Sequence, residues 1–104
     1  MSESTFSIDE KDVHAHLKAR MSDRGITIEE INTALKRGWP ADDAKSGTYG
    51  KVWVFSYEKE WLGRKFAEKE VTVYYKVMDE EVVILTAKAR YGDRFSKKEG
   101  SYEI

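Results

Sequence analysis

The sequence predicts an α+β domain in which two N-terminal helices pack on one face of a three- to four-stranded antiparallel sheet. Two observations lead to this fold class. Apolar residues recur at helical spacing as far as Gly38, and from Lys51 onward they alternate with a period of two. The chain has 104 residues, enough for one modest core and too few for two. We therefore expect a single domain over residues 1–104, with residues 1–7 and 96–104 as mobile tails.

The first helix is expected from about Asp9 to Met21. Its apolar stripe has a four-residue spacing and consists of Val13, Leu17 and Met21. Ser7, followed three residues later by Glu10, offers a capping box at the start. Gly25 can adopt the left-handed conformation that closes a helix, so the helix should end before it.

The second helix has two independent start signals. Thr27 and Glu30 have the spacing of a capping box, and Ile26 and Ile31 have the spacing of a hydrophobic staple. Gly38 and the proline that follows it should stop the helix. Both start signals agree on a helix that begins directly after Thr27.

The second half of the chain predicts strands. Residues 39–50 are rich in turn formers and are expected to be a loop. Strands are expected over Val52–Tyr57, Glu70–Val77 and Val82–Arg90, with a further short piece at Trp61–Phe66 between the first two. These strands should form an antiparallel meander.

A three-residue turn of Asp79, Glu80 and Glu81 is preferred between the last two strands. It places Glu70 opposite Arg90 and leaves one almost wholly apolar face. That face contains Val71, Val73, Tyr75, Val77, Val83, Leu85, Ala87 and Ala89. Ile84 falls on the opposite face in this register.

Composition narrows the classes of function. The chain has no cysteine, which excludes a disulfide framework and a thiolate zinc site. Its 18 Lys and Arg against 19 Asp and Glu exclude a globally basic surface, so any phosphate-binding patch must be local. The longest aliphatic run, Val82 to Leu85, is far shorter than a membrane span, and the N-terminus does not resemble a signal peptide. A cytoplasmic location is therefore expected.

The polar face of the predicted sheet could carry chemistry. It contains Glu70, Thr72, Tyr74, Lys76, Thr86, Lys88 and Arg90, with Tyr91 just beyond. Cleavage of RNA by its own 2′-hydroxyl needs a base, a cation for the developing phosphorane charge and an acid for the leaving oxygen. Glu70 could be the base, and Lys88 with Arg90 could supply the cations. The same alternation is also typical of a solvated sheet face, so that alternative stays open.

The first helix adds further candidates. His14 and His16 point about 200° apart on a helix, which disfavours a shared metal ion. His14 could act in catalysis or be a boundary histidine with one hydrogen bond. Arg20 and Arg24 could contact phosphate or pair with nearby acids. Asp42-Asp43 lacks the further oxygen ligands of a magnesium or calcium site, so no metal and no cofactor are expected.

Aromatic residues alternate along the first predicted strand. Trp53, Phe55 and Tyr57 share one side, and Val52 and Val54 share the other. If the aromatic side faces outward, it resembles the platforms on which unpaired bases stack. Burial of the strand on both sides is the alternative.

One set of motifs resembles a known family. His14 with Ala15, then Arg20-Met21, then Arg24-Gly25-Ile26-Thr27 are followed by a helix and by a sheet that ends in Val83–Tyr91. This pattern, over roughly residues 13–91, resembles a family of short bacterial proteins, domain-of-unknown-function family 4258. That family is similar to the RelE and BrnT toxins. The resemblance implies two helices on an antiparallel sheet and, for some relatives, RNA cleavage.

The resemblance suggests a first hypothesis, a cytosolic RelE-like toxin or ribonuclease that cleaves RNA without a metal ion. His14 or Glu70 would be the base, and Lys88 and Arg90 would stabilise the phosphorane. RNA contacts would come from Arg20, Arg24, Tyr74, Lys76 and Tyr91. The implied partners are RNA and a cognate antitoxin protein, and a homo-oligomer is a further alternative.

The second hypothesis is a non-catalytic module of the same fold that binds a protein or a nucleic acid. Its surface would be the aromatic strand or a sheet edge. The charge of the chain favours this alternative, because RelE-type ribonucleases are usually strongly basic and this chain has a net charge of −1.

Overall fold

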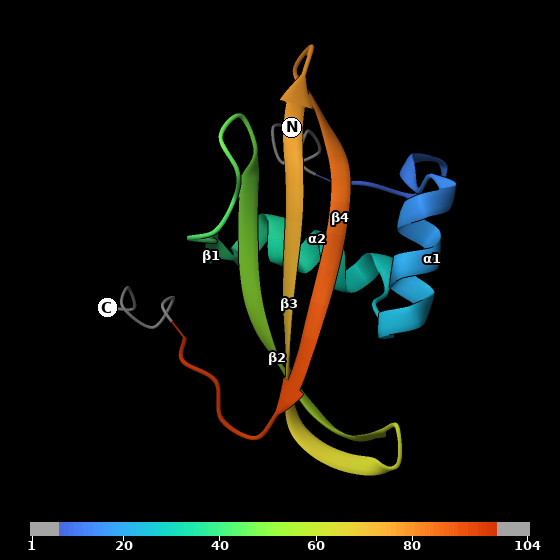
Figure 1. The fold of residues 1–104 in the computed structure, drawn as a ribbon, viewed down its shortest axis with the longest axis vertical. Coiled ribbons are helices and arrows are strands. Elements are labelled where there is room, and N and C mark those ends of the chain that lie inside the picture. The colour runs from blue at the N-terminus through green and yellow to red at the C-terminus, as the bar shows by residue number, and fades with distance from the viewer. Residues whose placement is uncertain (1–6, 98–104) are drawn as a thin grey trace.

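The computed structural model describes residues 7–97 and confirms the α+β fold class: two helices precede an antiparallel sheet (Figure 1). The helices are α1 (Ala15–Arg24) and α2 (Ile28–Arg37). The strands are β1 (Trp39–Pro40), β2 (Tyr49–Trp61), β3 (Arg64–Met78) and β4 (Glu81–Gly92), in the spatial order β1-β2-β3-β4. Both helices lie on one side of the sheet, and the opposite side, called the outer face below, faces the viewer in Figure 1.

The N-terminal helix differs from the expectation. A single 3₁₀ turn, η2 (Glu10–Asp12), stands where its first residues were expected. Asp9 and Asp12 cap this turn reciprocally, in place of the expected capping box of Ser7 and Glu10. Because the reciprocal cap closes one short turn, the chain is extended again at Val13 and the long helix begins later.

Helix α1 begins after His14 and ends at Arg24. The His14 ring accepts a hydrogen bond from the backbone N–H of Leu17 and so caps the helix. Gly25 closes it with φ of 71°, the left-handed conformation expected of this glycine. Leu17 and Met21 remain on the buried stripe, so the predicted face of the helix is correct although its start is wrong.

Helix α2 confirms the prediction in detail. The Thr27 side chain accepts from the Glu30 N–H at 3.1 Å, and the Glu30 carboxylate accepts from the Thr27 N–H at 3.1 Å. Ile31 and Leu35 are buried against the sheet. The helix ends at Arg37, directly before Gly38.

Strands β2 and β3 form one long hairpin. The piece expected at Trp61–Phe66 is the end of β2, a two-residue turn of Leu62 and Gly63, and the start of β3. The left-handed φ angles of both turn residues, 52° and 86°, suit the twist of a tight hairpin. A bulge between Ser56 and Lys59 bends the hairpin, whose end curves away below the sheet in Figure 1.

The turn between β3 and β4 has two residues, not the three expected. Asp79 and Glu80 have φ of 54° and 67° and form this turn. The register still pairs Glu70 with Arg90, because a bulge at Leu85 restores it. The bulge also changes which face two side chains occupy. Ile84, expected on the polar face, is buried in the core with 2% exposure. Leu85, expected on the apolar face, lies on the outer face, where it lines a pocket with Tyr74.

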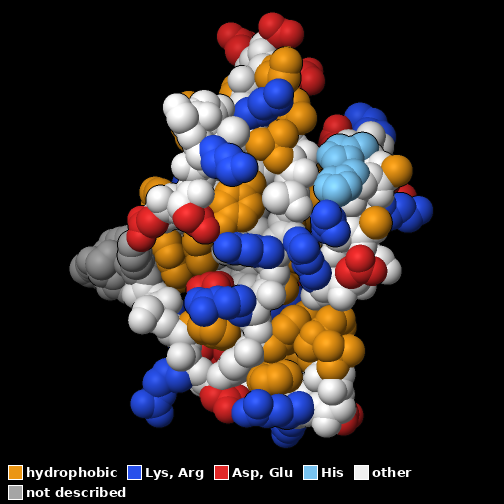
Figure 2. All heavy atoms as spheres, in the orientation of Figure 1, with side chains coloured by type: hydrophobic (Ala, Val, Ile, Leu, Met, Phe, Trp, Pro, Cys, Tyr) orange, Lys and Arg blue, Asp and Glu red, His pale blue; other side chains and the backbone are white. Residues whose placement is uncertain are grey.

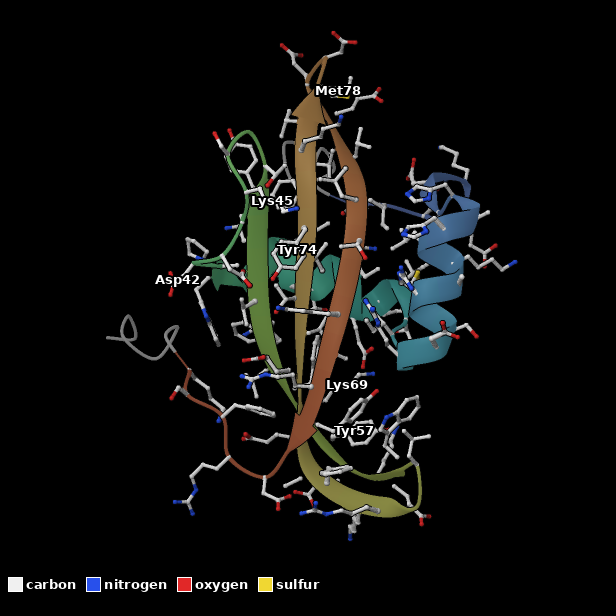
Figure 3. The ribbon with its side chains drawn as sticks, viewed as in Figure 1. Asp42, Lys45, Tyr57, Lys69, Tyr74 and Met78 are labelled. Carbon is white, nitrogen blue, oxygen red and sulfur yellow. The ribbon has the colours of Figure 1, made fainter. Side chains whose placement is uncertain are left out.

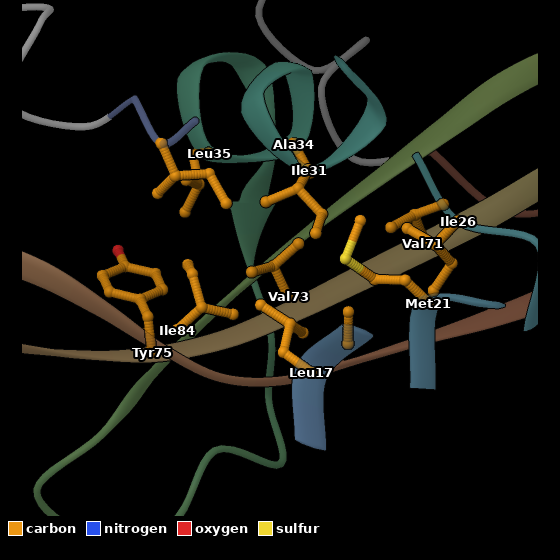
Figure 4. Close-up of a cluster of buried hydrophobic side chains, with 12 residues drawn as sticks. Leu17, Met21, Ile26, Ile31, Ala34, Leu35, Val71, Val73, Tyr75 and Ile84 are labelled. Carbon is orange, nitrogen blue, oxygen red and sulfur yellow. The ribbon is translucent and has the colours of Figure 1, made fainter. Parts of the chain in front are cut away.

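The core lies between the helices and the inner face of β3 and β4 (Figure 4). Its buried members are Ile8, Leu17, Met21, Ile26, Ile31, Ala34, Leu35, Val71, Val73, Tyr75, Ile84 and Ala87. Trp53 and Phe55 pack against this cluster and are partly buried, while Val52 is buried on the other side of β2. The alternative of a strand covered on both sides therefore describes this part of β2.

Two other predictions concern the ends of elements. The predicted loop at 39–50 contains β1, which pairs with β2 through Trp39 and Val52, and the first two residues of β2. Of the expected tails, Ser7, Ser96 and Lys97 are described, and the remaining residues, 1–6 and 98–104, lie outside the described part. Within residues 7–97, no helix is both long and apolar enough to cross a membrane.

Candidate functional site

The outer face of the sheet contains a groove of about 470 Å³. Residues of β2, β3 and β4 form its floor, and the chain after β1 and Ser96 form its walls. Its polar lining includes Asp42, Asp43, Glu70, Thr72, Tyr74, Lys88 and Arg90. Figure 2 shows Lys and Arg side chains down the middle of this face, and Figure 3 places Tyr74 at its centre. Five residues of the predicted polar face therefore line one groove: Glu70, Thr72, Tyr74, Lys88 and Arg90.

Glu70 and Arg90 form a two-pronged ion pair across β3 and β4. The Arg90 Nε donates to Glu70 at 2.7 Å and its Nη2 donates to the second oxygen at 3.1 Å. The Glu70 side chain is 13% exposed and that of Arg90 is 64% exposed. This pairing raises the pKa of Arg90. Glu70 therefore orients the guanidinium, whose outer side remains open to an anion.

Asp43, Tyr74 and Lys88 form a second cluster beside this pair. The Tyr74 hydroxyl donates to the Asp43 carboxylate at 2.8 and 3.0 Å, and the Lys88 Nζ lies 3.3 Å from Asp43. The hydrogen bond from Tyr74, with help from Lys88, lowers the pKa of Asp43. Burial raises the pKa of Tyr74, and hydrogen bonding with Tyr74 and Asp43 raises that of Lys88. The cluster is therefore a carboxylate, a neutral phenol and an ammonium at neutral pH.

Asp43 is the residue of this cluster that is not among the predicted site residues. It lies in the chain between β1 and β2, 31 residues before Tyr74 and 45 before Lys88. From the sequence, Asp42-Asp43 is considered only as a magnesium or calcium site, which it does not fit. The pairing of β1 with β2 carries this segment over the sheet, and a two-residue strand leaves no periodic signal in a sequence.

His14 and Arg24 lie at the edge of β4, away from the groove. The His14 Nε2 lies 3.1 Å from the Ile84 carbonyl oxygen, and Arg24 donates to the Ala87 carbonyl oxygen at 2.8 Å. Both nitrogens of the His14 ring are thus held by backbone groups, since the other one caps Leu17. A ring in this position has no free lone pair for a proton, so His14 is not suited to be the predicted base.

Tyr91 lies on the inner side of the sheet, not with Lys88 and Arg90. Its hydroxyl donates to the Arg24 carbonyl oxygen at 2.6 Å, and its ring stacks on Trp61 with centroids 4.8 Å apart. Lys69 lies beside it with an exposure of 2% and donates to the Gly25 carbonyl oxygen and to Glu30. These contacts attach the turn between α1 and α2 to the sheet, which is a structural role.

The two remaining predicted RNA contacts, Lys76 and Arg20, lie outside the lining of the groove. Lys76 follows Tyr74 by two residues on β3 and shares the outer face with it. Arg20 is half-buried on α1. Neither residue lines the groove that contains Lys88 and Arg90.

The segment after β4 closes one end of the groove. The Phe95 ring lies 4.9 Å from the Arg90 guanidinium, and its backbone N–H donates to Glu68 at 2.8 Å. Lys97 pairs with the same carboxylate at 2.8 Å. These two contacts lower the pKa of Glu68. Glu68 is thus the anchor that holds this segment beside Arg90.

No family model, no curated protein and no solved structure matches this chain. The described residues also contain no group of three or more His, Asp or Glu side chains placed to hold a metal ion.

Proposed function

We propose that the protein is a RelE-like ribonuclease that binds RNA in the groove on the outer face and cleaves it without a metal ion. The observation that carries the proposal is the meeting of four groups in one groove: the carboxylate of Asp43, the phenol of Tyr74, the ammonium of Lys88 and the guanidinium of Arg90. These are the kinds of group that attack by a 2′-hydroxyl requires.

Lys88 and Arg90 would bind the phosphate. They are two residues apart on β4, so both point to the outer face with about 7 Å between their positions along the strand. Their side chains are 47% and 64% exposed, which leaves them accessible to a phosphodiester. Tyr74, whose ring lies 5.4 Å from the Lys88 Nζ, is placed to contact a ribose or to stack on a base.

The direct test measures binding and cleavage separately. Binding of a fluorescent single-stranded RNA is followed by anisotropy, and cleavage is followed on gels in the presence of EDTA. Lys88→Ala and Arg90→Ala are expected to weaken binding and to reduce cleavage by at least about 100-fold, because each removes a cation from the phosphate. Lys65→Ala is the matched control, since Lys65 is an exposed lysine in the part of the hairpin formed by the end of β2 and the start of β3.

Growth of a bacterial host tests the toxin part of the proposal. Induced wild-type protein should arrest growth, whereas Lys88→Ala and Arg90→Ala should not at equal expression, with folding checked by circular dichroism. RNA that stays intact with pure wild-type protein, together with normal growth, would refute the proposed activity.

A non-catalytic binding module is the second candidate function. It is favoured by the pairing of two of the groove's carboxylates, because Glu70 already binds Arg90 and Asp43 already binds Tyr74 and Lys88. If the module binds RNA, the anisotropy assay would show binding with no product on the gel. If it binds a protein, the assay would show neither binding nor cleavage of RNA.

A further inference from the structure

The base of the proposed reaction can be assigned more closely. We propose that Asp43 is the group that removes the proton from the attacking 2′-hydroxyl, an assignment that rests on the ribonuclease function proposed above. The Asp43 side chain is 61% exposed at the wall of the groove. It lies 3.3 Å from the Lys88 ammonium, so a phosphate bound to Lys88 lies close to this carboxylate.

The other expected bases are less suited. The Glu70 side chain is 13% exposed, against 61% for Asp43, so its carboxylate, which is paired with Arg90, is less accessible to a 2′-hydroxyl. His14 is held by backbone groups at the edge of β4. Of the described carboxylates that line the groove, Asp42 and Asp43 remain, and the Asp43 carboxylate lies 3.3 Å from the Lys88 Nζ and accepts from the Tyr74 hydroxyl.

The neighbours of Asp43 also orient it. Tyr74 donates one hydroxyl to both carboxylate oxygens, which holds the group over the centre of the outer face. Each carboxylate oxygen has a further lone pair that can accept a proton. Tyr74 is thus a positioning residue for Asp43 in this assignment.

The Asp43 carboxylate accepts the 2′-hydroxyl proton, the 2′-oxygen forms a bond to phosphorus, and the bond from phosphorus to the 5′-oxygen breaks. Water protonates the leaving 5′-oxygen, and Asp43 returns its proton to the resulting hydroxide. The products are a 2′,3′-cyclic phosphate and a 5′-hydroxyl end, with no oxidant or metal consumed.

The dependence of the rate on pH distinguishes Asp43 from a histidine base. Tyr74 and Lys88 hold the pKa of Asp43 below its usual range, so the carboxylate is ionised throughout the neutral range. The acid limb of the rate profile should then lie below about pH 4. A histidine base would place the acid limb of the rate profile at about pH 6.5.

The experiment compares full-length wild type with Asp43→Asn, Asp42→Asn and Asp23→Asn. A short RNA is the probe, with anisotropy for binding and product analysis for the 2′,3′-cyclic phosphate. Asp43→Asn keeps an acceptor for Tyr74, and should lose at least about 100-fold in cleavage rate while RNA affinity does not fall. Asp23 is exposed on α1, so Asp23→Asn should match the wild type and controls for the loss of one negative charge.

Each other outcome overturns the assignment. Cleavage by Asp43→Asn within threefold of wild type would remove Asp43 as the base and leave the ribonuclease function standing. A 100-fold loss in Asp42→Asn instead would transfer the role to its neighbour. Equal losses of binding and cleavage would show a structural role, and an acid limb near pH 6.5 would point to histidine. Absence of cleavage by wild type would refute the ribonuclease function itself.

Discussion

The two faces of the sheet use lysine in opposite ways. Lys69 on the inner face is 2% exposed, and its ammonium donates to both oxygens of Glu30 at 2.8 and 3.0 Å. Lys88 on the outer face is 47% exposed, and its ion pair is to Asp43 at 3.3 Å. A buried lysine with every donor committed holds elements together, whereas an exposed one can exchange its partner for a ligand. The contrast separates residues that maintain the fold from residues available for function.

Loss of the inner lysine should have the largest effect on stability. Lys69→Met leaves the Glu30 carboxylate, which is 19% exposed, without its cation, and should lower the free energy of unfolding by about 3–5 kcal/mol. Lys88→Met on the outer face should cost about 0–1 kcal/mol. Urea unfolding followed by tryptophan fluorescence measures both. Equal losses in the two variants would remove the distinction between the faces.

The bulge in β4 makes a sharper comparison between adjacent residues. Ile84→Ala should lower the free energy of unfolding by about 2–5 kcal/mol, because it empties a core position. Leu85→Ala, on the outer face, should cost less than about 1 kcal/mol. The same urea titrations test this pair. A larger loss for Leu85→Ala would mean that the register lacks the bulge.

The smallest expected effect is the pH dependence from Glu68. Lys97 and the Phe95 N–H lower the pKa of Glu68 in the folded protein, so its contribution is complete above about pH 5 and is lost as the pH falls toward 3. The difference in unfolding free energy between wild type and Glu68→Gln should be no more than about 1 kcal/mol at pH 7. It should shrink toward zero at pH 3, and a difference that grows on acidification would contradict this sign.

Local signals predicted the parts of the fold that depend on neighbouring residues. The start of α2 follows from Thr27 and Glu30, which are three residues apart, and the pairing of Glu70 with Arg90 follows from the alternation of the strands. The two-residue turn at Asp79 was missed because two non-glycine residues there have left-handed φ angles, which sequence patterns disfavour. The bulge that compensates for it gives no periodic signal of its own.

Local signals also predicted only part of the candidate site. Tyr74, Lys88 and Arg90 were found because alternation along strands places them on one face. Asp43 and the role of His14 depend on contacts between segments 31 and 70 residues apart, which a single sequence does not reveal. For His14, the sequence therefore left a catalytic role and a boundary histidine with a hydrogen bond as alternatives, and the backbone contacts of the ring favour the second.

The contacts of His14 and Arg24 with β4 have a consequence for how copies of this chain meet. The outermost strand of a sheet is a template on which a second chain can add its own strand, and such growth leads to aggregates. Here the Ile84 and Ala87 carbonyl oxygens already have side-chain partners. An incoming strand must displace the His14 imidazole and the Arg24 guanidinium before it can pair with these carbonyl oxygens. The two side chains therefore hinder the edge-to-edge association of copies along β4.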